Sequence, residues 1–439
     1  MTERPRTRIL PALFPAASAP AVRPAGAKRG CRRAAAAAVC AALLLSGCGV
    51  LGDSADEAPL TVMTWAPENT RATNKPGMTA MARAYARWIN AQGGLGHREL
   101  RVLTCNDHND AVGAAACARR AVREDVVAVV GSYSQHGRSF LGPLEAAGIP
   151  YIGGYGVTED EFTSPLSYPV NGGQPAVLAG VGQELAERCG RVALVRPDTV
   201  AGDNLPVLLN AGLAKAGLRV RDVRAAEDDT SYSEVARQAL EYATGDPGEQ
   251  GCVTAALGER TDTFFDSFRR TEDGYPAVRV ASVLGSVDQS VIDRTGGATG
   301  PYEGAYVTGW YPVASDPRWQ ELRAVIDRQA FGDNRVDAAD AGVQTTWIAY
   351  TVLRRAVESL GGGEVSARTL RRTFDDGLQV GTGGLTPKLS WRFEDMIAVR
   401  DFPRLVNADV TFQVVRDGRL VAERRGAVDM SRTLESAPD

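Results

Sequence analysis

The stretch Val126-Val-Ala-Val-Val130, followed by Gly131-Ser-Tyr-Ser134, decides the fold class of this 439-residue chain. The five apolar residues form a continuous run with no polar alternation, which predicts a strand buried on both faces, as in parallel sheets. A helix is expected to begin near Arg138, a few residues after the strand ends. The stretch therefore predicts one strand–loop–helix unit of a parallel sheet covered by helices.

The same alternation of strand and helix continues in both directions along the chain. Strands are expected at 60–65, 100–104, 148–152, 191–195, 218–223, 252–257, 277–284 and 305–309, and helices at 78–90, 112–123, 205–216, 233–243, 262–270 and 343–360. Near the C-terminus, Asp417-Gly418 predicts a hairpin turn between strands 409–416 and 419–424. The pattern is typical of an α/β protein with parallel sheets.

The N-terminus has the features of an export signal. A basic run, 28–33, precedes an apolar segment, 34–45, which is shorter than the roughly 20 residues needed to cross a bilayer. Leu45-Ser-Gly-Cys48 then resembles the cleavage site of a bacterial lipoprotein. The resemblance implies that 1–47 is a removed signal peptide, that Cys48 carries lipid, and that 48–58 is a tether to the outer face of the cell membrane. The alternative is an ordinary signal peptide with a chance cysteine.

Composition limits the class of partner. The net charge of the chain is −4, with 49 basic and 53 acidic residues, so we expect no nucleic-acid partner. The chain without its leader has about 390 residues, enough for two domains of ordinary size.

Four cysteines remain after Cys31, Cys40 and Cys48 are set aside, and an even number in an exported protein favours disulfides. Cys105 closes a predicted strand and Cys117 lies one loop further on. Cys189 and Cys252 lie at the beginnings of two strands expected to be neighbours in a parallel sheet. Of the three possible pairings we therefore predict Cys105–Cys117 with Cys189–Cys252.

Several motifs, in order, resemble those of the type I periplasmic binding proteins, and in particular the branched-chain amino acid/amide substrate-binding branch of ABC importers. They are Trp88-Ile-Asn-Ala-Gln-Gly-Gly-Leu-Gly96, Cys105-Asn-Asp107, Val126–Ser134, Gly148-Ile-Pro150, Leu166-Ser-Tyr-Pro169, Thr346–Tyr350 and Gly383-Gly-Leu-Thr-Pro387. The resemblance implies two doubly wound parallel-sheet lobes joined by three crossovers. Mapped onto this chain, lobe one is 59–169 with 310–378, lobe two is 170–309 with 379–430, and 431–439 is a disordered tail.

The resemblance also implies a function. A small polar molecule of the amino acid, amide or short-peptide class is captured between the two lobes and passed to a membrane ABC permease. We expect a monomer with no cofactor and no metal. A ligand-sensing lipoprotein that signals to a membrane receptor without transport is the alternative.

Candidate ligand contacts in lobe one follow the carboxyl ends of strands, where open α/β sheets bind ligands. They are Ser132, Tyr133, Ser134, Gly154 and Tyr155. The hydroxyls and free backbone N–H groups of the first three suit an anionic group. The alternatives are helix capping by the serines and a plain loop for the glycine-rich stretch.

In lobe two the candidates are Glu259, Arg260 and Ser286. Leu284 lies where relatives that bind amino acids carry an acid for the ligand ammonium, so we expect Glu259 to replace that acid and Arg260 to clamp a carboxylate. A solvated surface ion pair is the alternative. The aromatic residues Trp65, Trp310 and Tyr311 are candidates to line the cleft, although core packing is the favoured interpretation.

Enzymatic alternatives have weaker support in the sequence. Ser132-Tyr-Ser-Gln-His136 lacks the glycines of a nucleophile elbow, and His136 is too close in sequence to serve the serine. Cys105-Asn-Asp-His-Asn-Asp110 contains side chains that can bind metals, but its cysteine is better explained by a disulfide and the rest by a turn rich in Asn and Asp. We therefore predict that the chain is not an enzyme.

Overall fold

A computed structural model describes residues 58–71 and 73–437. The predicted signal peptide, Cys48 and the tether up to 57 lie outside these residues. The first sheet is wholly parallel and has the order β2-β1-β3-β4-β5. Its strands are β1 Leu60–Trp65, β2 Leu100–Cys105, β3 Ala128–Val130, β4 Tyr151–Ile152 and β5 Ser167–Tyr168.

The second sheet has the order β12-β11-β10-β9-β8-β6-β7, with β13 paired to β11. Its strands are β6 Arg191–Pro197, β7 Val220–Ala225, β8 Gly251–Ala255, β9 Arg279–Val283, β10 Tyr306–Gly309, β11 Asp409–Arg416, β12 Arg419–Ala422 and β13 Val428–Asp429. β6 to β10 are parallel, and β11 is antiparallel to its neighbours. Asp417 and Gly418 both have positive φ, 52° and 69°, as the predicted tight hairpin requires.

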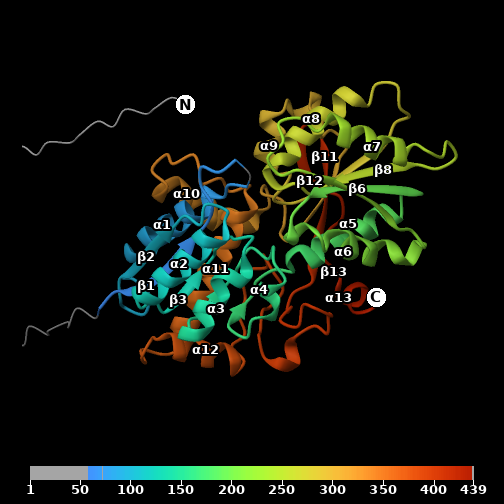
Figure 1. Ribbon diagram of the computed structural model, residues 1–439. Coiled ribbons are helices and arrows are strands. Elements are labelled where there is room, and N and C mark those ends of the chain that lie inside the picture. The colour runs from blue at the N-terminus through green and yellow to red at the C-terminus, as the bar shows by residue number, and fades with distance from the viewer. Residues whose placement is uncertain (1–57, 72, 438–439) are drawn as a thin grey trace, which may run out of the picture. The chain divides into compact units, whose positions relative to one another are not determined.

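Helices cover both sheets (Figure 1). They are α1 Pro76–Asn90, α2 Ala111–Arg123, α3 Gly137–Ala147, α4 Asp160–Thr163, α5 Gly173–Ala186, α6 Leu205–Leu213, α7 Ser233–Ala243, α8 Thr261–Thr271, α9 Gln289–Arg294, α10 Gln320–Gln329, α11 Ala341–Ser359, α12 Ala367–Asp375 and α13 Ser431–Glu435. Their ends follow local chemistry. Pro76 begins α1, the Asp110 side chain caps α2, and Gly148 ends α3 with a φ of 72°.

The core of the first sheet follows the two-residue period of β1. Leu60 and Val62 face one cluster of buried residues together with α1 and α11, whereas Met63 and Trp65 face a second cluster formed with α2 and α3. β1 is therefore covered on both sides. In Figure 1 the second sheet likewise lies between α5 and α6 on one side and α7 and α8 on the other.

The chain passes between the two sheets three times. It leaves the first sheet after β5, leaves the second after β10, and returns from α12 to β11. α10 and α11 pack on α1, and α11 also contacts β3 and β4. The predicted fold class, two parallel α/β sheets joined by three crossovers, is confirmed.

The C-terminal segment differs from the prediction. Residues 431–439 were expected to be disordered, but Ser431–Glu435 forms α13, which contacts α5 and α6. The side chain of Leu434 is 4% exposed. A short segment that buries a leucine against two helices gains enough apolar contact to stay ordered.

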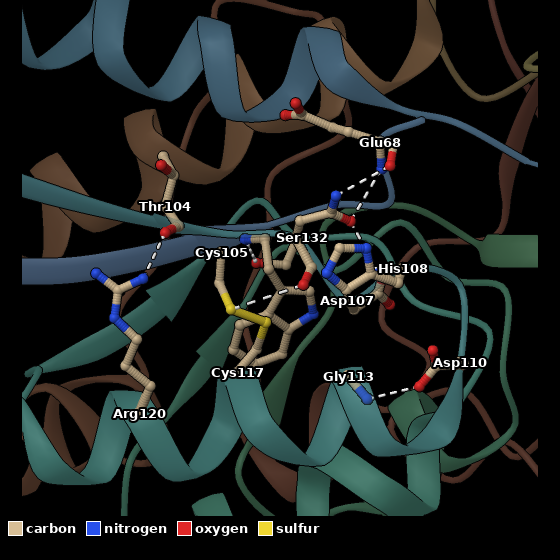
Figure 2. The surroundings of a disulfide bond; sticks show 12 residues. Glu68, Thr104, Cys105, Asp107, His108, Asp110, Gly113, Cys117, Arg120 and Ser132 are labelled. Carbon is tan, nitrogen blue, oxygen red and sulfur yellow. Dashed lines mark hydrogen bonds between the residues drawn. A yellow bond between two sulfur atoms is a disulfide. The ribbon is translucent and has the colours of Figure 1, made fainter. Parts of the chain in front are cut away.

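Both predicted disulfides are present. Cys105–Cys117 joins the end of β2 to α2, with the Cα atoms 5.8 Å apart. Figure 2 shows this bond beside two other contacts that fix α2, the Arg120 side chain donating to the Thr104 carbonyl and Asp110 accepting from the Gly113 N–H. Cys189–Cys252 joins the beginnings of β6 and β8, which are adjacent strands, with the Cα atoms 6.0 Å apart. The prediction from the strand order is therefore confirmed.

Candidate ligand-binding site

Two cavities lie where loops from the carboxyl ends of strands in both sheets meet, the location at which α/β sheets bind ligands. The first sheet contributes the loops after β1, β3 and β4, and the second contributes those after β6, β7, β8 and β9. We call these the small cavity and the large cavity. They share Lys75, Gly285 and Ser286 in their walls.

The small cavity has a volume of about 80 Å³ and is lined by both polar and apolar side chains. Its polar lining includes Lys75, Tyr133, Gln135, Tyr155 and Glu227, and its apolar lining includes Val177, Leu178, Leu205, Leu284 and Trp310. A cavity that combines a few polar groups with apolar side chains suits a small amphipathic molecule.

The large cavity has a volume of about 650 Å³ and a predominantly charged lining. Its basic residues are Arg71, Lys75, Arg260, Arg294 and Arg335, and its acidic residues are Glu259, Asp262, Asp288, Asp337 and Asp340. Equal numbers of the two signs make this lining neutral as a whole, so it offers no general attraction for anions or cations.

Two predicted tyrosines lie in the wall of the small cavity. The ring centroids of Tyr133 and Tyr155 are 5.1 Å apart with a near-perpendicular orientation, and Tyr155 stands at the same distance from Trp310. Burial raises the pKa of both hydroxyls above its ordinary value. Both are therefore neutral near pH 7 and can donate hydrogen bonds to a ligand.

The other predicted contacts of lobe one point elsewhere. The Ser132 hydroxyl accepts from the Trp65 backbone N–H at 3.1 Å, and the Ser134 hydroxyl accepts from the His136 N–H at 3.2 Å. Gly154 packs so closely on Tyr151 that an added Cβ would lie 2.3 Å from the Tyr151 ring. None of these three residues lines the small or the large cavity.

The predicted residues of lobe two do lie together. Ser286 lines both cavities, and Glu259 and Arg260 line the large one. Glu259 accepts from the Asn74 side chain at 3.3 Å, and Arg260 donates to the Arg71 carbonyl at 2.7 Å. Burial raises the pKa of Glu259 above its ordinary value, partly offset by Lys75 and Asn74. Both side chains therefore contact the loop after β1.

The remaining predicted aromatic residues pack in the core. Trp65 and Tyr311 are fully buried, and Trp310 is 4% exposed with its indole N–H donating to the Gly173 carbonyl at 2.8 Å. Of the three, Trp310 also lines the small cavity. Core packing, the favoured interpretation, describes Trp65 and Tyr311.

Sequence reasoning missed Lys75, Gln135 and Glu227. The Gln135 amide donates to Glu227 at 2.9 Å and to the Tyr133 hydroxyl at 3.2 Å, which connects the loop after β3 to the loop after β7. Lys75 is one of only four lysines in a chain whose basic residues are otherwise arginines. That rarity was the one signal in the sequence that could have drawn attention to it.

Comparison with known proteins identifies the class. The sequence profile of the periplasmic binding protein family matches residues 70–401, so the chain belongs to this family. The resemblance predicted from the motifs is thereby confirmed. No curated protein matches the chain.

Solved structures share the fold at low sequence identity. A substrate-binding periplasmic protein from Ralstonia solanacearum is 16% identical, with a TM-score of 0.68 over 83% of this chain and 100% of its own. A leucine-binding protein from Thermotoga maritima is 15% identical, with a TM-score of 0.65 over 85% of this chain and 99% of its own. A third structure is a solute-binding protein of an ABC transporter from Rhodopseudomonas palustris in complex with 3,4-dihydroxybenzoic acid. It is 12% identical, with a TM-score of 0.67 over 84% of this chain and 97% of its own.

Membership of the family has direct consequences. Its members bind solutes outside the cytoplasm and do not catalyse reactions, which confirms the prediction that the chain is not an enzyme. Within residues 58–71 and 73–437, none of the helices combines the length and the apolar character needed to cross a bilayer.

Proposed function

We propose that this chain is a lipid-anchored solute-binding protein of an ABC importer, acting as a monomer on the outer face of the cell membrane. It captures a small polar ligand of the amino acid, amide or short-peptide class between two lobes. The observation that carries the proposal is the small cavity, whose walls come from strand ends of both sheets. A molecule bound there contacts both sheets at once and can couple binding to hinge closure.

The proposed lobes are 59–169 with 310–378, and 170–309 with 379–430. Sheet membership supports this division, since β1 to β5 form one sheet and β6 to β12 the other. Closure of one lobe on the other gives the permease a surface that differs between the empty and the loaded protein. A membrane permease with cytoplasmic ATPases is the proposed partner.

A screen of small metabolites by thermal shift tests the binding function. We expect at least one compound to raise the melting temperature by several degrees at saturating concentration, because a ligand that binds only the folded state stabilises it by mass action. Small-angle scattering with that compound should show a smaller radius of gyration as the lobes close. A library that leaves both the melting temperature and the scattering unchanged would contradict the proposal.

The lipid anchor is tested separately with Cys48→Ser in the full chain. Without a thiol to carry the lipid, the protein should move from the membrane fraction to the soluble extracytoplasmic fraction, because the lipid chains provide most of its affinity for the membrane. Cys31→Ser, in the predicted leader, is the matched control and should leave the mature protein on the membrane. Retention of the Cys48→Ser protein on the membrane, with no loss of labelled lipid, would refute the anchor.

A further inference from the structure

Lys75 places a buried cation in the wall shared by the two cavities. Its side chain is 6% exposed. The ammonium donates to the Gly285 carbonyl at 3.3 Å, lies 3.7 Å from an Asp340 carboxylate oxygen, and stands 5.7 Å from the centre of the Tyr155 ring. An ammonium has three N–H donors, and among the described residues this is its one hydrogen bond to the protein. Even if one donor points to Asp340, one donor remains for a bound molecule.

The carboxylates around Lys75 keep it charged, and two of them also serve as helix caps. Asp340 accepts from the Val343 N–H at 2.8 Å as the cap of α11, and Asp288 caps α9 in the same way. Burial opposes the charged ammonium, but Tyr155 and the nearby carboxylates outweigh it and raise the pKa of Lys75 above its ordinary value. The lysine is therefore a fixed positive charge near pH 7.

The rest of the small cavity defines what the cation can bind. The hydroxyls of Tyr133 and Tyr155 add neutral donors to the lining of the small cavity, and its apolar lining residues suit a short hydrocarbon body. Leu284, 5% exposed, belongs to the apolar lining of this cavity. Glu227, the carboxylate that lines this cavity, already accepts from Gln135 and Thr73.

We propose that Lys75 binds the anionic group of the ligand, and that the ligand is a compact carboxylate with a short apolar body. This inference rests on the proposed solute-binding function and names the ligand class of that same site. The sequence predicted Ser132 and Ser134 as contacts for an anionic group, but their hydroxyls form hydrogen bonds within the protein. In this proposal the anionic group is bound instead by Lys75, from the loop after β1.

Four compounds of nearly equal size distinguish the contribution of the ligand carboxylate from that of the ligand ammonium. They are valine, 3-methylbutanoate, valinamide and 3-methylbutanamide. The first two carry a carboxylate and the last two carry an uncharged amide, while valine and valinamide add an ammonium. Titration calorimetry with the unmodified protein should give the acids affinities about 10- to 100-fold higher than the matching amides, since a hydrogen bond to a charged group is that strong. This comparison needs no variant and does not depend on the folding of one.

The variant Lys75→Met tests the residue itself, with the exposed Lys388→Met as the matched control. Lys75→Met should lower the affinity for the acid about 10- to 100-fold and leave that for the amide unchanged, whereas Lys388→Met should change neither. Either order of valine and 3-methylbutanoate supports the proposal. Tighter valine shows that the site also holds the ligand ammonium, and tighter 3-methylbutanoate shows that it takes simple acids.

Two results would overturn the inference. Amides that bind as tightly as acids, or an unchanged acid affinity in Lys75→Met, would show that Lys75 does not bind the ligand. Failure of all four compounds would refute the ligand class. In that case a hit of another chemistry in the metabolite screen leaves the solute-binding function standing, whereas a screen without hits removes both proposals.

Discussion

Replacing Glu161 with alanine is expected to destabilise the protein strongly and to displace Tyr155 from the small cavity. The Glu161 carboxyl is 1% exposed and accepts the backbone N–H groups of Gly156, Val157 and Thr158 at 2.9 to 3.1 Å. These residues directly follow Tyr155. Three N–H groups left without an acceptor cost about 3 to 9 kcal/mol in the free energy of unfolding, at roughly 1 to 3 kcal/mol each.

Urea unfolding measures this loss, and Glu159→Ala on the same loop is the matched control, since Glu159 is exposed. The control should change the free energy of unfolding by less than about 0.5 kcal/mol. Ligand binding by Glu161→Ala, measured below its melting temperature, should weaken as well, because the loop that carries Tyr155 loses its support. A loss below about 1 kcal/mol would show that water or another group replaces the carboxyl.

The same residue gives a pH dependence with a definite sign. Burial raises the pKa of Glu161 to about 7 from an ordinary 4.5, against the hydrogen bonds from Thr158, Gly156 and Val157 that lower it. Between these values the unfolded chain has lost the proton and the folded chain still holds it. The contribution of the protonated Glu161 to the free energy of unfolding is therefore complete below pH 4.5 and is lost as the pH rises through 7. The total loss is up to about 3 kcal/mol. Glu161→Gln cannot titrate, so its stability relative to the unmodified protein should rise over this window and level off above it.

The fold was predictable where apolar runs coincide with strands. The stretch 60–65 became β1 with the predicted bounds, and the pairing of Cys189 with Cys252 followed from strand order. No bounds were predicted for α5, because this helix is buried nearly all round and its sequence lacks the one-sided apolar period of a surface helix. α12 was not predicted, although Ser366 forms a capping box with Thr369 that marks its beginning.

The candidate site was predictable only in part, because a loop fixes which residues are near a site but not where each side chain points. Tyr133 and Ser132 are adjacent in sequence, yet one lines the small cavity and the other turns to the Trp65 N–H. Lys75 lies ten residues after β1, in a loop without a regular pattern. Its position depends on Gly285 and Asp340, which are more than 200 residues away in sequence.

Removal of the Cys189–Cys252 disulfide is expected to cost more stability than removal of Cys105–Cys117. The first bond closes a separation of 63 residues and the second a separation of 12. Loop-closure entropy in the unfolded chain predicts losses of about 4 and about 3 kcal/mol respectively, because a longer closed loop restricts more of the unfolded ensemble. The experiment compares the double variants Cys189→Ala/Cys252→Ala and Cys105→Ala/Cys117→Ala by guanidinium unfolding without reductant.

Reductant provides the control for this comparison. Adding dithiothreitol to the unmodified protein should lower the free energy of unfolding further than either double variant alone, and each variant should respond only through its remaining disulfide. The order of the two losses is the decisive result. Cys105–Cys117 lies between β2 and α2, in a cluster where Cys117 is fully buried. A larger loss of unfolding free energy for this pair would contradict the prediction. It would mean that packing in the folded state contributes more to stability than the length of the closed loop.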